Sequence, residues 1–573
     1  MIKLDTRRLT GINVIWKHAG AVVDVRLNSK EHAEAVISSW NTHSRQLLDA
    51  IGWGEEKSVG YPMHSGVALA ISAPMDALYA AVEVADWLFE QVKAETAVHS
   101  DDEAQADPEE ESEKPLNDLD PVARLKEVIK EESNPALQTL LTRAQQKNTT
   151  VLCDDDEVSI GLGRYSTTWP VDQIPVDIDW NAARDVPTGL VTGTNGKTTT
   201  VRLTQRMLRA ADLAVGISST DWIGIDDTII DRGDYSGPGG ARAVLRQPID
   251  AAILETARGG LLRRGLGMPR ADVALITNIA EDHLGDFGSE SLQELLNLKW
   301  IVTQALDQSS IAVLNAQDDL LLEKSAELEV PICWFSIDPA HPKVKSHIGK
   351  QLPAVTVVDD HFSRFDGKEW HNYCRVSDAP LTVDGSAKHN VVNALGAIAL
   401  AHYLGASDVA INHGLTNMLP NDNPGRCNFF TIDGVDVLLD FAHNPSAMQA
   451  IFDIAAHHKA NNRFLCFGQA GDRTDNSIRK LARNAWDIGL KHVFISELAE
   501  HRRGREPDEV FNLLSEGLMA GGAERTDISH YAVEKESLDH ALAMAKPGDL
   551  VIILALAEAR SILAWLEQNA IKQ

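Results

Sequence analysis

The chain has 573 residues, 44% of them hydrophobic, and a formal net charge of −30. The length leaves room for about three or four globular domains, whereas the acidic balance argues against a nucleic-acid-binding protein, which normally presents a basic face. The sequence shows no apolar run of about 18 residues, no apolar signal segment at its start and no C-x-x-C spacing among its five cysteines, so we expect a cytoplasmic protein that binds no membrane.

Residues 1–98 are expected to form a small α/β module. Residues 21–27 and 67–72 have the apolar runs of strands, and residues 30–51 have the periodicity of an amphipathic helix. A second helix is expected from Pro74 onward, because proline is favoured in the first turn of a helix. This additional module also suggests self-association into a homo-oligomer.

An acidic segment separates the module from the rest of the chain. Residues 101–114 contain eight acidic side chains and no large apolar one, so residues 99–118 are predicted to be a disordered linker. Residues 119–184 are predicted to be a connecting region, with a helical stretch over 121–147 followed by a β-rich stretch over 149–169.

Strands and helices then alternate, as they do in proteins built on a parallel sheet. Residues 185–422 are predicted to form a central α/β domain with a β-rich elaboration over 331–388. Its strands are expected at residues 186–192, 251–256, 273–277 and 311–314, with a helix over 293–306.

A cluster of helix and strand breakers, residues 420–425 (PNDNPG), marks the next domain boundary and is expected to act as a hinge. Residues 423–573 are predicted to form a Rossmann-like α/β domain. Its strands are expected at residues 435–441, 463–467, 492–496 and 550–554.

The most specific local signal is the sequence GTNGKT at residues 193–198, between a predicted strand and a predicted helix. Glycines let backbone N–H groups approach phosphate oxygens, and the N-terminus of the following helix adds electrostatic attraction. In such a loop Lys197 would reach the phosphates and Thr198 would place a hydroxyl on Mg²⁺. The sequence therefore predicts an ATP-binding P-loop.

Two further polar groups follow predicted strands of the same sheet, where ligands of open α/β sheets bind. Glu255 ends one strand, and Asn278, Asp282 and His283 follow the next. Carboxylate and amide oxygens suit Mg²⁺, and a second cation would neutralise charge on a transferring phosphoryl group. A role of Glu255 in capping the following turn is equally open.

The combination of motifs resembles the Mur ligase superfamily, and within it the Mur-ligase-like half of the cyanophycin synthetases without their ATP-grasp module. The resemblance covers residues 185–573. Besides the P-loop, the motifs are ETARGG at 255–260, NIAEDHLG at 278–285, HNVVNA at 389–394, GR at 425–426, DFAHNP at 440–445, GDR at 471–473 and RGR at 503–505.

The resemblance implies two magnesium ions, bound by Glu255 and His283 with Thr198 at the phosphates. It also implies that Lys299 is carbamylated and ligates the second ion; an ordinary helix-surface lysine is nearly as well supported. The catalytic set that it implies is Lys197, Glu255, His283, Lys299 and Arg426.

The nucleotide would lie between the central and C-terminal domains. The resemblance places Asn390 and Asn393 near the adenine, and Arg426 on the γ-phosphate. The complete set for binding ATP is Gly193, Thr194, Asn195, Gly196, Lys197, Thr198, Thr199, Asn390, Asn393, Arg426, Asp440 and His443.

The implied activity is that of an ATP-dependent ligase that joins a carboxylate and an amine through an acyl phosphate. The substrates would be an amino acid or amine and the carboxylate of an acidic amino acid or peptide. Arg502, Arg503 and Arg505 could bind a substrate carboxylate, or they could form a solvated basic face. Two alternatives are a P-loop NTPase switch and a catalytically silent binding subunit.

Overall fold

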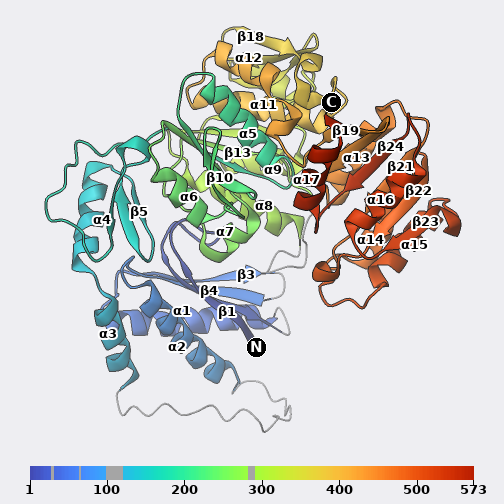
Figure 1. Ribbon diagram of the computed structural model, residues 1–573. Coiled ribbons are helices and arrows are strands. Elements are labelled where there is room, and N and C mark those ends of the chain that lie inside the picture. The colour runs from blue at the N-terminus through green and yellow to red at the C-terminus, as the bar shows by residue number, and fades with distance from the viewer. Residues whose placement is uncertain (28–30, 64–65, 98–119, 282–290, 573) are drawn as a thin grey trace. The chain divides into compact units, whose positions relative to one another are not determined.

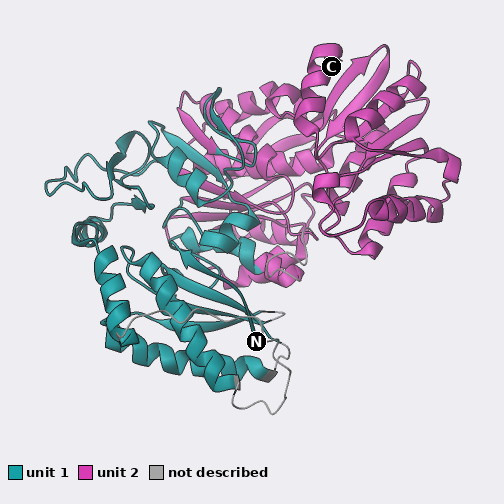
Figure 2. Cartoon of the chain, turned by 60° about the horizontal axis from the view of Figure 1, so that its bottom comes forward, with its two compact units in different colours: residues 1–187, 218–271, 297–307 teal, residues 188–217, 272–296, 308–573 magenta. Residues whose placement is uncertain are grey.

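The computed structural model describes residues 1–27, 31–63, 66–97, 120–281 and 291–572 (Figure 1). The predicted linker, residues 99–118, and the predicted metal ligand His283 lie outside these residues. The chain divides into two compact units (Figure 2): unit 1 comprises residues 1–187, 218–271 and 297–307, and unit 2 comprises residues 188–217, 272–296 and 308–573. Among the described residues, no helix combines the length and apolar character that crossing a bilayer requires.

Unit 1 begins with an antiparallel sheet of strand order β1-β2-β4-β3, with two helices packed on one face. Its elements are β1 (Ile2–Leu9), β2 (Gly20–Arg26), α1 (Glu31–Ile51), β3 (Ser58–Met63), β4 (Gly66–Ser72) and α2 (Leu78–Ala97). In the core, the fully buried indole of Trp40 donates a hydrogen bond to the carbonyl of Ala70. The predicted α/β module is confirmed, although α2 begins at Leu78 and residues 74–77 form a turn.

The connecting region holds two helices and a small sheet of order β5-β6-β7. Its elements are α3 (Pro121–Glu132), α4 (Pro135–Lys147), β5 (Val151–Cys153), β6 (Glu157–Ile160) and β7 (Thr167–Pro170). The predicted helical stretch over 121–147 is confirmed and consists of two helices, α3 and α4. Pro135 cannot continue α3, and the side chain of Asn134 accepts hydrogen bonds from the backbone of Ala136 and Leu137, which caps α4.

The remainder of unit 1 follows later in the sequence and contacts the N-terminal module. Its elements are β10 (Trp222–Ile225), β11 (Thr228–Arg232), α6 (Pro238–Leu245), β12 (Ala251–Glu255) and α7 (Arg258–Arg264). The backbone N–H of Leu266, just after α7, donates to the carbonyl of Ile12 over 2.7 Å, and that of Thr10 donates to Arg264. The segment that follows Glu255 therefore packs on the N-terminal module.

Unit 2 contains the phosphate-loop sheet, in which β8, β13, β14, β15 and β16 are parallel neighbours and β17 and β18 add antiparallel strands. The strands are β8 (Thr188–Thr192), β9 (Val215–Ser218), β13 (Val273–Ile276), β14 (Ile311–Asn315), β15 (Ile332–Ser336), β16 (Ala354–Val358), β17 (His361–Phe365) and β18 (Trp370–Arg375). The helices are α5 (Lys197–Arg209), α9 (Asp319–Lys324), α10 (Pro342–Gly349), α11 (Lys388–Tyr403) and α12 (Asp408–Asn417). Helix α8 (Leu292–Trp300) has its first residues in unit 2, whereas its residues from Asn297 onward belong to unit 1. The predicted central strands and the β-rich elaboration are confirmed. The predicted helix over 293–306 ends earlier, at Trp300, and a 3₁₀ turn follows.

The C-terminal part of unit 2 is a seven-stranded sheet of order β23-β22-β21-β24-β20-β19-β25. Successive strand residues point to opposite faces: Leu465 packs in one core with residues of α13, α14 and α15, whereas Phe464 packs in another with residues of α16 and α17. The predicted Rossmann-like domain is therefore confirmed. Its elements are β19 (Asn428–Ile432), β20 (Val435–Asp440), α13 (Pro445–His457), β21 (Arg463–Phe467), α14 (Asp475–Trp486), β22 (Leu490–Ser496), α15 (Glu509–Ala520), β23 (Ile528–Tyr531), α16 (Glu534–Met544), β24 (Leu550–Leu554), α17 (Ala559–Asn569) and β25 (Ile571–Lys572).

Candidate active site

The loop of residues 193–196 connects β8 to α5 in a conformation that requires glycine at both ends. Gly193 has φ of 144° and Gly196, the N-cap of α5, has φ of 85°. A Cβ atom at Gly193 would lie 1.9 Å from Oγ1 of Thr277, and one at Gly196 would lie 2.0 Å from Oδ1 of Asn393. Backbone and side chains therefore close on the loop so tightly that no side chain fits at either position.

Residues that follow β13 hold this loop by several hydrogen bonds. The backbone N–H of Asn195 donates to Oδ1 of Asn278 over 3.1 Å. The carbonyl of Asn195 accepts from Oγ1 of Thr277 (2.6 Å) and from Nδ2 of Asn278 (3.0 Å). The N–H of Thr194 donates to the carbonyl of Asn278. The polar residues after the neighbouring strands β8 and β13 thus lie together. The side-chain amide of Asn278 holds the loop by hydrogen bonds to its backbone.

Lys197 is the first residue of α5, and its ammonium lies over the loop. Its Nζ atom donates to the carbonyls of Gly193 (3.1 Å) and Thr194 (3.0 Å). Thr198 and Thr199 follow in the first turn of the helix and are buried. A fixed ammonium, a helix N-terminus and a glycine-rich backbone together can bind a phosphate chain.

Two of the predicted nucleotide residues lie on α11. Asn393 lies against Gly196 and donates from Nδ2 to Oδ1 of Asn390 over 3.2 Å. Asn390 in turn donates to the carbonyl of Leu381. The structure thus brings Asn393 to the phosphate loop, while the adenine contacts of both residues stay predictions.

The C-terminal domain contributes the residues after β20. Asp440, the last residue of that strand, accepts a hydrogen bond from the backbone N–H of Cys427 over 2.7 Å. Burial raises the pKa of Asp440 to about 6, against the opposing effect of the Arg426 charge. His443 Nδ1 lies 3.0 Å from the carbonyl of Phe441.

A residue to which the sequence assigned no role links this segment to the phosphate loop. The side chains of Asn444 and Asn195 form two hydrogen bonds, of 2.8 and 3.2 Å. Asn444 is also the N-cap of α13 and precedes Pro445. Asparagine before proline is a typical start of a helix. The N-cap could therefore be predicted from the sequence, whereas the contact with Asn195 could not.

The predicted hinge, residues 420–425, is attached to α5. Asn423, with 0% of its surface exposed, accepts from Nη1 of Arg202 (3.0 Å) and donates to Oγ1 of Thr199 (3.1 Å). Asp422 forms an ion pair with Arg206. The boundary between the domains is therefore held by the helix that follows the phosphate loop.

Two other predicted metal ligands, Glu255 and Lys299, belong to unit 1. Glu255 is the last residue of β12 and is 2% exposed, and Lys299 on α8 is 4% exposed. The burial of Lys299 rules out an ordinary helix-surface lysine, because lysine is rarely buried without a partner. The phosphate loop, Asn278, Asn393 and Asn444 come together in unit 2. The roles of Glu255, Lys299 and His283 stay predictions.

Two of the three arginines considered for a substrate carboxylate are engaged within their own domain. Arg505 donates to the carbonyls of Gly471 (2.9 Å) and Arg473 (2.7 Å). Arg502 forms an ion pair with Glu497 over 3.3 Å. These contacts favour a role of Arg502 and Arg505 in holding the surrounding loops.

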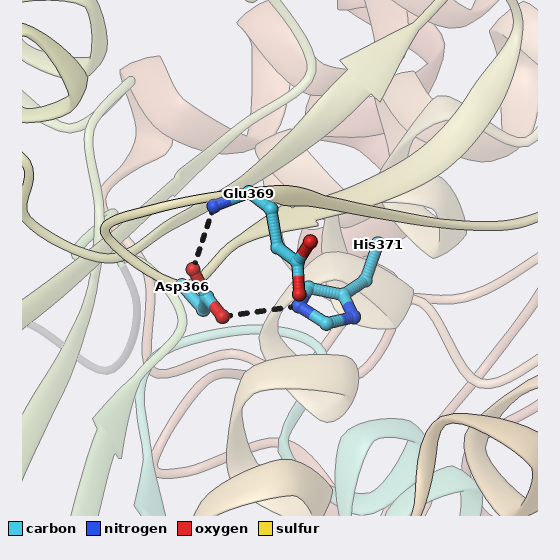
Figure 3. A group of neighbouring side chains, drawn as sticks. All are labelled: Asp366, Glu369 and His371. Carbon is cyan, nitrogen blue, oxygen red and sulfur yellow. Dashed lines mark hydrogen bonds and ion pairs between the residues drawn. The ribbon is translucent and has the colours of Figure 1, made fainter.

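A separate group of potential metal ligands, Asp366, Glu369 and His371, lies at the β17–β18 turn (Figure 3). The backbone N–H groups of Glu369 and Lys368 and the ring of His371 hold the pKa of Asp366 well below its ordinary value. His371 Nδ1 also lies 2.7 Å from the carboxylate of Asp408, at the start of α12. These contacts fix the turn, and we assign no ligand to it.

The raised pKa of Asp440 predicts a pH-dependent stability. The folded state binds the proton of Asp440 more tightly than the unfolded chain, so the contribution of Asp440 to the free energy of unfolding falls as pH rises from about 4 to about 6 and is flat above. Asp440→Asn should remove this decline, which amounts to about 3 kcal/mol. Thermal unfolding from pH 4.5 to 7.5 should therefore show the variant gaining on the native protein as pH rises. Parallel curves would contradict the assignment.

Two family profiles match the chain. That of the Mur ligase middle domain matches residues 191–401, and that of the Mur ligase glutamate ligase domain matches residues 425–555. Together they span more than half of the sequence. The first includes the phosphate loop and Asn393, and the second includes Asp440 and Asn444.

Similar proteins are found among the curated sequences and the solved structures. A cyanophycin synthetase from Geminocystis herdmanii is 32% identical over 409 residues, 70% of this chain and 46% of that protein. The UDP-N-acetylmuramoyl-L-alanyl-D-glutamate–2,6-diaminopimelate ligase of Chlamydia caviae is 25% identical over 373 residues, 63% of this chain and 71% of that protein. A structure of E. coli FolC with DHPP and ADP gives a TM-score of 0.49 at 18% identity, covering 67% of this chain and 89% of that one. The chain spans less than half the length of the cyanophycin synthetases that it matches.

Proposed function

Because the chain belongs to the Mur ligase superfamily and carries both its middle and its glutamate ligase domain, we propose that it is an ATP-dependent ligase that joins a carboxylate to an amine. The observation that carries the proposal is the phosphate loop. Its glycines, its bracing by Asn278 and the ammonium of Lys197 over its carbonyls form a site built for a phosphate chain.

In the proposed reaction a carboxylate oxygen attacks the γ-phosphorus of ATP, ADP leaves, and the amine then displaces phosphate from the acyl phosphate. The protein aligns the reactants and offsets the negative charge that develops on the phosphoryl oxygens. Lys197 supplies a positive charge at the loop. Arg426, beside Asp440 in the C-terminal domain, is proposed to supply another.

The proposed magnesium ligands have the chemistry that the ion requires. The hydroxyl of Thr198 lies in the first turn of α5, and the carboxylate of Glu255 ends a buried strand. Both are hard oxygen donors, which Mg²⁺ prefers. Magnesium would neutralise charge on the phosphates. His283 and Lys299, the latter as its carbamate, are proposed to complete the set, as the resemblance to the family implies.

The proposed substrates are an amino acid or similar amine and the carboxylate of an acidic amino acid or peptide. The names of the relatives, cyanophycin synthetase and UDP-N-acetylmuramoyl-L-alanyl-D-glutamate–2,6-diaminopimelate ligase, support this class. The chain matches only part of the cyanophycin synthetases, and a single ligation is the reaction proposed here.

The test is turnover of Mg-ATP by the purified full chain with mixtures of amines and acidic amino acids or dipeptides. The proposal expects ADP and phosphate in amounts equal to the amide identified by mass spectrometry. With an ¹⁸O-labelled carboxylate, one label should appear in the released phosphate. Equal ATP hydrolysis without either substrate would indicate an NTPase, and ATP binding without turnover would indicate a binding subunit.

A further inference from the structure

The phosphate loop and the C-terminal domain are joined by a pair of asparagine side chains. Nδ2 of Asn195 donates to Oδ1 of Asn444 over 3.2 Å, and Nδ2 of Asn444 donates to Oδ1 of Asn195 over 2.8 Å. We call this the amide pair. It connects positions 249 residues apart, one within the loop and one at the start of α13. Asn444 is fully buried, so the hydrogen bonds of its amide to Asn195 replace contacts with water.

On its other side, Asn195 is held by the backbone and side-chain bonds from Thr277 and Asn278. The amide pair therefore completes a clamp around one residue of the loop. Asn444 is itself oriented, because its Oδ1 also accepts from the N–H of Ala447 and caps α13. The position of α13 and the shape of the loop are thus fixed by the same side chain.

A second connection runs parallel to the first. Asn423, at the boundary that precedes the C-terminal domain, binds Arg202 and Thr199 on α5. Since α5 begins directly after the loop, the loop and its helix both contact the C-terminal part of the chain. A change in the conformation of the loop would therefore affect contacts at two residues of that part, Asn423 and Asn444.

We propose that Asn444 is a positioning residue for the phosphate loop, so that nucleotide affinity depends on a side chain of the C-terminal domain that acts through Asn195. This inference rests on the proposed function. Coupling between sites is reciprocal, so a nucleotide in the loop also favours the arrangement in which α13 contacts it.

The test is a double-mutant cycle on the full chain with Asn195→Ala and Asn444→Ser, read as the affinity for Mg-ADP by calorimetry. Serine keeps the cap of α13, because its hydroxyl can accept from Ala447, but it is too short to pair with Asn195. Loss of two neutral hydrogen bonds should weaken Mg-ADP binding about tenfold in N444S. The double variant should bind no more weakly than N195A.

Asn134→Ser is the matched control, because Asn134 is the N-cap of α4 in unit 1. This substitution should leave the affinity for Mg-ADP unchanged. Normal affinity in N444S, or effects of the two variants that simply add, would overturn the inference. Hydrogen exchange of residues 192–200 without nucleotide gives a second readout, which should be about tenfold faster in N444S. If the native protein binds no Mg-ADP, the proposed function fails, and the exchange rates alone decide whether Asn444 positions the loop.

Discussion

Lys197→Met is expected to lower the rate of ATP-dependent ligation by at least about 100-fold, since one preorganised charge at a developing anion contributes that much. The native ammonium is already oriented, because it bonds the carbonyls of Gly193 and Thr194. Methionine keeps an unbranched side chain of similar length without the charge. The rate constant with saturating substrates and the KM for ATP should both be measured, because a charge that acts mainly in the transition state changes kcat more than KM.

A lysine of the same unit provides the comparison. Lys345 is an exposed residue of α10, and Lys345→Met should leave both constants unchanged. Unfolding temperatures separate a loss of charge from a loss of fold. K197M should unfold within a few degrees of the native protein, because the substitution removes only the ammonium that donates to two backbone carbonyls of the loop. A K197M rate within threefold of the native rate would remove Lys197 from the proposed mechanism.

The phosphate loop was predictable because its signals are local. A buried strand, two glycines and a helix follow one another within about 20 residues, and the structure has each in its expected place, with α5 beginning at Lys197. Strand β1 lacked such a signal. Its first residues are exposed and include several charged side chains, and the alternation of Ile2 and Leu4 with Lys3 and Asp5 ends before the two successive arginines, Arg7 and Arg8. That alternation is too short to mark a strand by itself. Within the helical stretch over 121–147, Pro135 marks the start of the second helix, because proline is favoured in the first turn of a helix.

The contacts between motifs were beyond the sequence. Asn444 and Asn423 belong to stretches that the sequence singled out, but their partners, Asn195 and Thr199, lie more than 200 positions away. Periodicity and spacing describe neighbours along the chain and give no information on such a pairing. The burial of Lys299 likewise depends on packing around α8, which a nine-residue helix does not specify by itself.

Gly193→Ala should abolish the phosphate site and weaken Mg-ADP binding at least about 100-fold. This factor combines backbone strain of about 1–3 kcal/mol with the loss of the hydrogen bonds that hold the loop. The backbone at φ of 144° disfavours any side chain. The new Cβ would lie 1.9 Å from Oγ1 of Thr277. That hydroxyl cannot rotate away without losing its 2.6 Å bond to the carbonyl of Asn195. The loop must therefore shift, and its bonds to Asn278 shift with it.

Gly349→Ala is the matched control in the same unit. Gly349 ends α10, and a Cβ there would meet no heavy atom of the described residues within 4 Å. Alanine also costs less backbone entropy than glycine in a helix, by about 0.5–1 kcal/mol. We therefore expect G349A to bind Mg-ADP normally and to unfold at the same or a higher temperature, whereas G193A should unfold several degrees lower. Normal binding by G193A would mean that the nucleotide is held without this loop.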